Sequence, residues 1–173
     1  VRIDGDFAVT PSDSAIDFLQ RMLAMVETPP TALSRATPRN RLLSAKPGDP
    51  VLALARAMQA KGFSHGPLLS DGAVTGVFSE NVIFEALIQN QSLQITEETP
   101  LSAFASFLPI ARTLGKTYQF LPETATVDDA SDLFDRFAGK GRKRKILFLT
   151  KHGRPEESLR GLLSPYDVLD RGG

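Results

Sequence analysis

The feature that most constrains the fold of this chain is a short pattern that occurs twice. Gly76-Val-Phe-Ser79 and Gly161-Leu-Leu-Ser164 each place a glycine, two apolar residues and a serine in the same order, 85 residues apart (161 − 76). In both places an apolar, strand-like run leads to a serine that can cap a helix. Two copies of one unit, each too small for a robust core, are expected to pack on one another.

Apolar periodicity predicts the same order of elements around each copy of the pattern: strand, helix, strand, strand, helix. In the first copy these are residues 41–44, a helix opened by Pro50, residues 64–69 and 74–78 on either side of a Ser70-Asp-Gly72 turn, and a helix capped by Ser79. In the second copy they are residues 118–121, a helix from Val127, residues 145–150 and 159–163, and a helix that starts at Ser164.

Two further segments lie outside the copies. Thr10-Pro11 is typical of a helix start, and apolar residues recur at helical spacing from there to the Pro29-Pro30 stop. Thr99-Pro100 is expected to start a short linker helix, with Leu101, Phe104, Ala105 and Leu108 facing inward. The predicted organisation is an N-terminal helical extension over 1–40, a first repeat over 41–92, a linker helix over 93–117 and a second repeat over 118–173.

Composition limits the classes of function. The chain of 173 residues has a formal net charge of zero, 42% hydrophobic residues, no cysteine and two histidines. Disulfides, cysteine nucleophiles and histidine-rich metal centres are therefore excluded, and no apolar run is long enough to span a membrane. We expect a cytoplasmic protein that is not an enzyme, since no Gly-x-Ser-x-Gly motif surrounds any serine. The chain begins with valine, so we expect it to be a piece of a longer protein.

The end of the second copy has the residue types of an anion and hydroxyl site. Ser164 is placed to cap a helix, Pro165 to occupy its first position, and Asp167 falls in its first turn. Free backbone N–H groups at such a helix start attract phosphate, and a carboxylate can accept hydrogen bonds from vicinal ribose hydroxyls. The same Ser-x-x-Asp spacing also describes a capping box, in which the two side chains satisfy backbone donors alone.

With these residues the chain resembles a tandem pair of cystathionine β-synthase (CBS) domains, called a Bateman module. The family pattern is glycine, two apolar residues, serine or threonine, two variable residues and aspartate, and the second copy matches it in full at Gly161, Ser164 and Asp167. The resemblance covers roughly residues 42–89 and 118–171. It implies an α/β fold in which two repeats pack through their sheets, with the N-terminal helix added.

The resemblance also implies a regulatory module that binds an adenosine compound such as AMP, ADP, ATP or S-adenosylmethionine. By the family pattern, Ser164 would contact phosphate and Asp167 would hold the ribose hydroxyls, while the base would lie near Ala125, Thr126 and Phe148. The first copy has Val82 where the aspartate belongs, and valine cannot hold a hydroxyl. At most one good nucleotide site is therefore expected.

The densest charge is the run Gly139-Lys-Gly-Arg-Lys-Arg-Lys145, which leads into a predicted strand beside the expected site. A solvated loop, a phosphate clamp that includes Lys145 and a nucleic-acid contact are three interpretations of this run; the neutral chain and the lack of interleaved aromatic residues disfavour nucleic acid. The function favoured by the sequence is nucleotide sensing by a homodimer that regulates an attached or partner protein. The alternative is a ligand-free dimerisation and assembly module.

Overall fold

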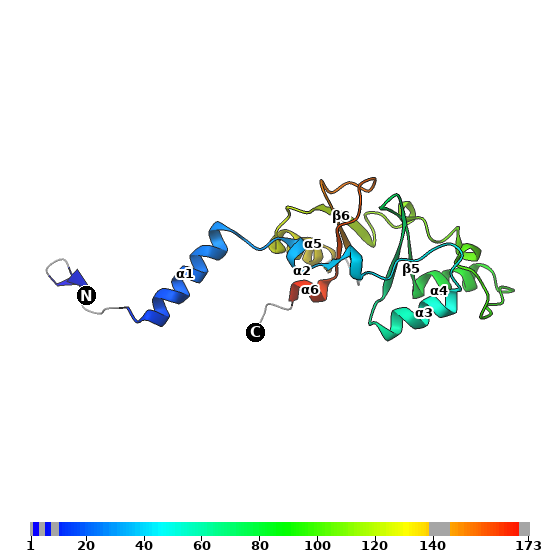
Figure 1. Cartoon of the computed structure of the whole chain (residues 1–173), viewed down its shortest axis with the longest axis horizontal. Helices are drawn as coiled ribbons and strands as arrows, with labels where there is room; N and C mark the ends of the chain where they lie inside the picture. Colours follow the sequence, from blue (N-terminus) through cyan, green and yellow to red (C-terminus); the bar gives the residue numbers. More distant parts are fainter. Residues whose placement is uncertain (1, 4–5, 8–10, 139–145, 170–173) are drawn as a thin grey trace. The chain divides into compact units, whose positions relative to one another are not determined.

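A computed structural model describes residues 2–3, 6–7, 11–138 and 146–169 of the chain (Figure 1). The chain divides into two compact units, Val1–Pro30 and Thr31–Gly173. Of the helices in the described ranges, none has the length and hydropathy needed to cross a membrane.

The first unit contains one long helix. Strands β1 (Arg2–Ile3) and β2 (Asp6–Phe7) pair antiparallel, and α1 follows (Asp13–Glu27). Helix α1 begins later than the predicted Thr10-Pro11 start because Ser12 supplies the cap, its Oγ accepting from the Ala15 amide at 3.3 Å. The apolar face predicted for this helix is exposed, at Phe18, Leu19, Met22, Leu23 and Val26.

The second unit holds both predicted repeats. The second repeat has the predicted order of strand, helix, strand, strand, helix, whereas in the first repeat the opening strand is reduced to one isolated bridge between Ala45 and Leu68. The elements of this unit are α2 (Ala32–Arg35), β3 (Thr37–Pro38), η1 (Arg39–Arg41), α3 (Val51–Ala60), β4 (His65–Ser70), β5 (Ala73–Ser79), α4 (Glu80–Gln89), η2 (Leu101–Phe104), η3 (Ile110–Arg112), β6 (Tyr118–Pro122), α5 (Val127–Ala138), β7 (Ile146–Thr150), β8 (Gly161–Leu163) and α6 (Pro165–Leu169).

Each repeat builds its own sheet. In the first, β4 and β5 form an antiparallel hairpin whose turn places Asp71 and Gly72 at positive φ, as the predicted Ser70-Asp-Gly72 turn requires. In the second, the order of strands is β3-β8-β7-β6, with β6 and β7 parallel because α5 crosses between them.

Alternation along the strands divides the core of this unit into three layers. Successive side chains point to opposite faces of a strand, so Ile146 and Phe148 face one layer while Leu147 and Leu149 face another. The middle layer joins the two sheets; its buried members are Val74, Val77, Ile110, Tyr118, Phe120, Ile146, Phe148, Leu159 and Leu162. The outer layers cover each sheet with helices, α3 and α4 on the sheet of the first repeat and α2, α5 and α6 on the sheet of the second.

The segment that leads into each repeat packs on the other repeat. Residues 31–38 precede the first repeat, yet β3 pairs with β8, and the Ala32 amide donates to the Ala125 carbonyl at 2.7 Å. Residues 99–109 precede the second repeat, yet the Val77 amide donates to the Leu108 carbonyl at 2.9 Å. We call these two stretches the exchanged lead-in segments.

The exchange explains the glycine of the repeated motif. A Cβ at Gly76 would lie 2.8 Å from the Leu108 carbonyl oxygen, and one at Gly161 would lie 3.1 Å from the Ala36 Cβ and the Thr37 carbonyl oxygen. Both glycines are required by the close approach of a lead-in segment and not by a positive φ.

The lead-in segments differ from the linkers that the sequence predicts. Residues 31–40, expected within the N-terminal extension, lie in the same compact unit as the repeats. The single linker helix expected over 93–117 is instead two short 3₁₀ helices, η2 and η3, interrupted near Pro109. Leu101, Phe104 and Leu108 are buried as predicted, but Ala105 is exposed.

Candidate functional site

A cavity of about 450 Å³ lies where β8 continues into α6. Both repeats and one lead-in segment form its wall, so it exists only because the repeats are packed together. Its lining residues are Thr37, Leu42, Gly62, Phe63, Ser64, His65, Ile146, Leu162, Ser164, Pro165, Tyr166 and Asp167.

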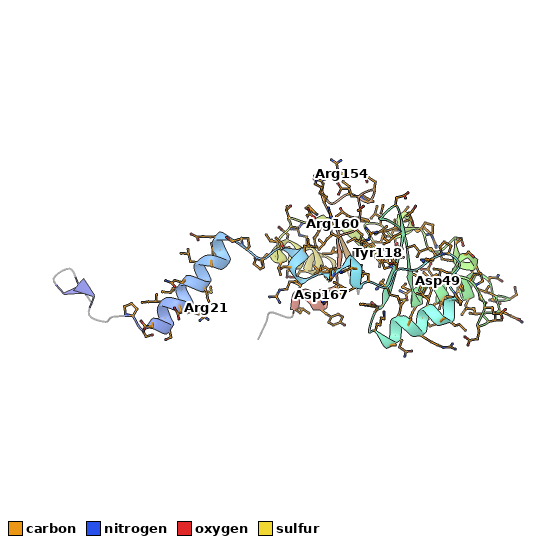
Figure 2. All side chains as sticks on the ribbon, in the orientation of Figure 1. Arg21, Asp49, Tyr118, Arg154, Arg160 and Asp167 are labelled. Atoms are coloured by element: carbon orange, nitrogen blue, oxygen red, sulfur yellow. The ribbon has the colours of Figure 1, made fainter. Side chains whose placement is uncertain are left out.

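Ser164 and Asp167 are joined by a tight pair of hydrogen bonds at this cavity. The Ser164 amide and the Ser164 hydroxyl both donate to Asp167 Oδ2, each at 2.6 Å. Asp167 lies at the start of α6 (Figure 2) and is half-buried. Both bonds engage one carboxylate oxygen, and within the described part of the chain no donor is recorded on Oδ1. That oxygen can accept hydrogen bonds from a ligand hydroxyl.

The same capping arrangement occurs at α5, away from this cavity. The Thr126 amide and hydroxyl donate to Asp129 Oδ2 at 2.9 and 2.8 Å, and the backbone and side-chain bonds from Thr126 lower the pKa of Asp129. Asp129 lies instead in a more open hollow on the surface of the second repeat. Capping explains the hydrogen bonds at both places, but only Asp167 combines them with the cavity between the repeats.

The first repeat contributes residues that sequence reasoning did not assign to the site. Phe63, Ser64 and His65 come just before and at the start of β4, and all three line the cavity. His65 Nδ1 lies 2.8 Å from Ser64 Oγ, and the His65 ring packs edge-on against Tyr118 with centroids 5.7 Å apart. These contacts make His65 a packed and hydrogen-bonded residue of the cavity wall. His65 and Asp167 line the same cavity although they are far apart in the sequence. No pattern in the residues around His65 predicts this proximity.

The structure brings only some of the predicted site residues together. Ser164, Pro165 and Asp167 line the cavity, and Gly161 comes directly before the lining residue Leu162. Ala125 and Thr126 lie at the start of α5, in contact with the lead-in segment through the Ala32 amide and a Thr31–Thr126 bridge. Phe148 is fully buried between the sheets, and Lys145 with the rest of the basic run is outside the described residues.

The exchanged lead-in segment explains this difference. Residues 31–38 cover the face of the second repeat that Ala125 and Thr126 would otherwise present. Apolar surface reaches the cavity instead from Leu42, Ile146 and Leu162. The contacts to a base that were predicted at Ala125, Thr126 and Phe148 have no support from the lining of this cavity.

The described lining of the cavity carries groups suited to the recognition of hydroxyls. Of its lining residues, which all belong to the described ranges, Asp167 is the one acidic group and none is lysine or arginine. Hydroxyls from Thr37, Ser64 and Ser164 and the His65 imidazole complete the polar surface, and apolar and aromatic side chains form the rest of the lining. A small molecule with an apolar ring and vicinal hydroxyls fits this chemistry.

Comparisons with known proteins agree on the fold. No protein-family model and no curated protein matches the sequence. Among solved structures, the chain is similar to CBSX2 in complex with AMP, with 18% identity over 81% of this chain and 93% of that chain and a TM-score of 0.54; CBSX2 is a CBS-pair protein from Arabidopsis thaliana. It is also similar to the CBS domain pair of MJ0100 in complex with 5′-methylthioadenosine and S-adenosyl-L-methionine, with 12% identity over 80% and 92% of the two chains and a TM-score of 0.54. The chain has the fold of a tandem CBS domain pair.

Proposed function

We propose that this CBS pair is a ligand-sensing regulatory module that binds an adenosine nucleotide or a related adenosyl compound, such as AMP, ADP, ATP or S-adenosylmethionine, in the cavity between its repeats. The observation that carries the proposal is the position of the Ser164–Asp167 pair at a cavity of about 450 Å³. This volume falls within the roughly 300–1,000 Å³ of typical small-molecule sites. The adenosine compounds in the CBSX2 and MJ0100 complexes support the same class of ligand.

Each part of the cavity has a role in this proposal. Asp167 Oδ1 accepts from the ribose hydroxyls, while the Ser164 hydroxyl turns toward a phosphate or the polar tail of the ligand. The base packs on the apolar wall formed by Leu42, Ile146 and Leu162. Because the wall comes from both repeats, a bound ligand stabilises one arrangement of the repeats, and this preference is the signal to an attached or partner protein. The module itself performs no catalysis.

The test is a thermal-shift titration of the chain against AMP, ADP, ATP and S-adenosylmethionine. A ligand at about 100 times its Kd adds about 2.7 kcal/mol to the free energy of unfolding, which corresponds to a rise in Tm of about 5–10 °C for a chain of this size. Asp167→Ala should abolish the rise.

Asp129→Ala is the matched control for that variant. It removes the same capping hydrogen bonds at α5, so each variant should lose about 1 kcal/mol of stability, but only Asp167→Ala should lose the ligand response. Equal responses in the two variants would contradict the role of Asp167. The lack of a response in the unmodified chain would leave the alternative, a ligand-free assembly module.

Exposed apolar surface on two helices supports assembly as part of either function. Phe84, Leu87 and Ile88 on α4 and Tyr166 and Leu169 on α6 are all exposed. Exposed apolar side chains of this kind mark interaction sites, and we propose that they form a homodimer interface. Ile88→Lys should therefore shift the sedimentation equilibrium toward monomer, whereas Lys at the neighbouring exposed Gln89 should not. A monomeric unmodified chain would rule the homodimer out.

A further inference from the structure

The open cavity lies beside the Gly-apolar-apolar-Ser motif of the second repeat. At the equivalent place beside the motif of the first repeat lies the side chain of Tyr118. The repeats can be superposed by their helix starts: Tyr118 lies nine residues before Val127 at the start of α5, and Leu42 lies nine residues before Val51 at the start of α3. Leu42 lines the open cavity. Its counterpart, Tyr118, has the larger side chain and is only 5% exposed.

Several neighbours of Tyr118 are counterparts of residues that line the open cavity, and its ring also packs on Phe148 with centroids 5.7 Å apart. The Tyr118 hydroxyl interacts with the side chain of Ser79, the counterpart of Ser164. The Tyr118 ring meets His65, which has the position in β4 that the cavity residue Ile146 has in β7. Val77, the counterpart of the lining residue Leu162, belongs to the same buried layer as Tyr118.

The surroundings of Ser79 and Ser164 differ accordingly. Ser79 is 6% exposed, and Val82, which replaces the aspartate of the motif, is also 6% exposed and packs in the core of the first repeat. Ser164 and Asp167 remain half-buried at the cavity wall. Burial raises the pKa of Tyr118 to about 12, although the hydrogen bond from Ser79 acts in the opposite direction.

We propose that the first repeat contains a second binding site whose occupant is the chain's own Tyr118, so that the module has a single site open to external ligands. The site suits an aromatic ring that carries one hydrogen-bonding group, because its wall combines apolar side chains with the Ser79 hydroxyl. Tyr118 supplies both features. The residue that determines how many ligands the pair accepts is therefore Tyr118 in the neighbouring repeat, in addition to Val82 in the motif itself.

Single cysteines test this proposal without any natural ligand, since the chain has no cysteine of its own. Ser164→Cys and Ser79→Cys place a thiol at the same motif position of the open and the filled site. The rate of modification by a small disulfide reagent such as 5,5′-dithiobis(2-nitrobenzoate) is then measured on the folded protein. A buried thiol reacts only through local opening, so Ser79→Cys should react roughly 100-fold more slowly than Ser164→Cys. Rates within about threefold of one another would overturn the proposal.

Removing the occupant is the second half of the test. Tyr118→Leu copies the counterpart Leu42 and should raise the modification rate of Ser79→Cys at least about tenfold, whereas Tyr118→Phe retains the ring and should leave the rate slow. An unchanged rate in Tyr118→Leu would overturn the assignment of Tyr118 as the occupant.

The double variant Ser164→Cys, Tyr118→Leu controls for unfolding. Its thiol should be modified at the same rate as in Ser164→Cys with Tyr118 retained. If Tyr118→Leu does not fold, Tyr118→Met retains more of the side-chain volume and serves in its place. The thiol readout is independent of nucleotide binding, so a failure of the proposed function and a failure of this proposal give different results.

Discussion

Replacement of Gly76 by alanine tests the exchange of lead-in segments directly. The new Cβ would lie 2.8 Å from the Leu108 carbonyl oxygen, closer than real Cβ contacts allow. That oxygen also accepts the 2.9 Å hydrogen bond from the Val77 amide, so the segment cannot move away without weakening the bond. Overpacking costs about 1–3 kcal/mol and a lost hydrogen bond about 1 kcal/mol, which together predict a loss of about 2–4 kcal/mol in the free energy of unfolding.

Two other glycines make the measurement quantitative. A Cβ at Gly161 would lie 3.1 Å from its neighbours, so Gly161→Ala should cost about 1 kcal/mol, less than Gly76→Ala. A Cβ at Gly48 would meet no atom within 4 Å, and Gly48 lacks a positive φ, so Gly48→Ala should be neutral or slightly stabilising through the unfolded chain.

Urea unfolding followed by circular dichroism gives the free energy of all three variants. Thermal unfolding should show the same order, with Gly76→Ala lowering the Tm by about 4–15 °C. If Gly76→Ala is as harmless as Gly48→Ala, residues 99–109 do not cross β5 at this point and the exchange is refuted.

Two further predictions concern other parts of the chain. Burial alone would raise the pKa of Glu157. Hydrogen bonds from the His152 amide at 2.7 Å and from the His152 ring at 2.6 Å outweigh this effect and lower the pKa of Glu157 from its ordinary 4.5 to about 2. The stability that this carboxylate contributes is present above pH 4.5 and is lost as the pH falls toward 2. The free energy of unfolding of Glu157→Gln should therefore differ from that of the parent chain at pH 7, and the two values should converge in acid. A pH-independent difference in urea unfolding would contradict the assignment. Removal of residues 1–30, a compact unit by themselves, should change the free energy of unfolding of residues 31–173 by less than about 0.5 kcal/mol, and a larger loss would show that α1 stabilises the repeats.

The sequence predicts those parts of the fold that depend on local periodicity. The run Ile146–Thr150 is buried throughout, as expected for a strand covered on both faces, and the Ser70-Asp-Gly72 turn joins β4 and β5. The repeated Gly-apolar-apolar-Ser pattern correctly indicates two packed α/β units. These features are encoded within a few residues of one another.

Contacts between distant segments could not be predicted in the same way. Nothing in Thr37-Pro38 indicates that it pairs with Gly161-Leu162, and this pairing is the reason that residues 31–40 lie with the repeats. The wall that Phe63, Ser64 and His65 form opposite Asp167 depends on that same packing. At Ser164 and Asp167 the spacing alone cannot separate a capping box from a ligand site, because the two have identical spacing. The position of this pair at the cavity is a fact of tertiary packing, and it supports the ligand site that we propose.

The exchanged lead-in segments also bear on how such a chain can arise and be divided. In a solitary repeat the lead-in segment would have no partner, and the Gly-apolar-apolar-Ser strand would be uncovered. Two such repeats could fill both places only by exchanging their lead-in segments. The tandem chain is thus the covalent form of a swapped dimer. Cutting it near residues 90–98 should yield two fragments that fold poorly apart but complement one another when mixed, which makes the pair a natural starting point for a split reporter.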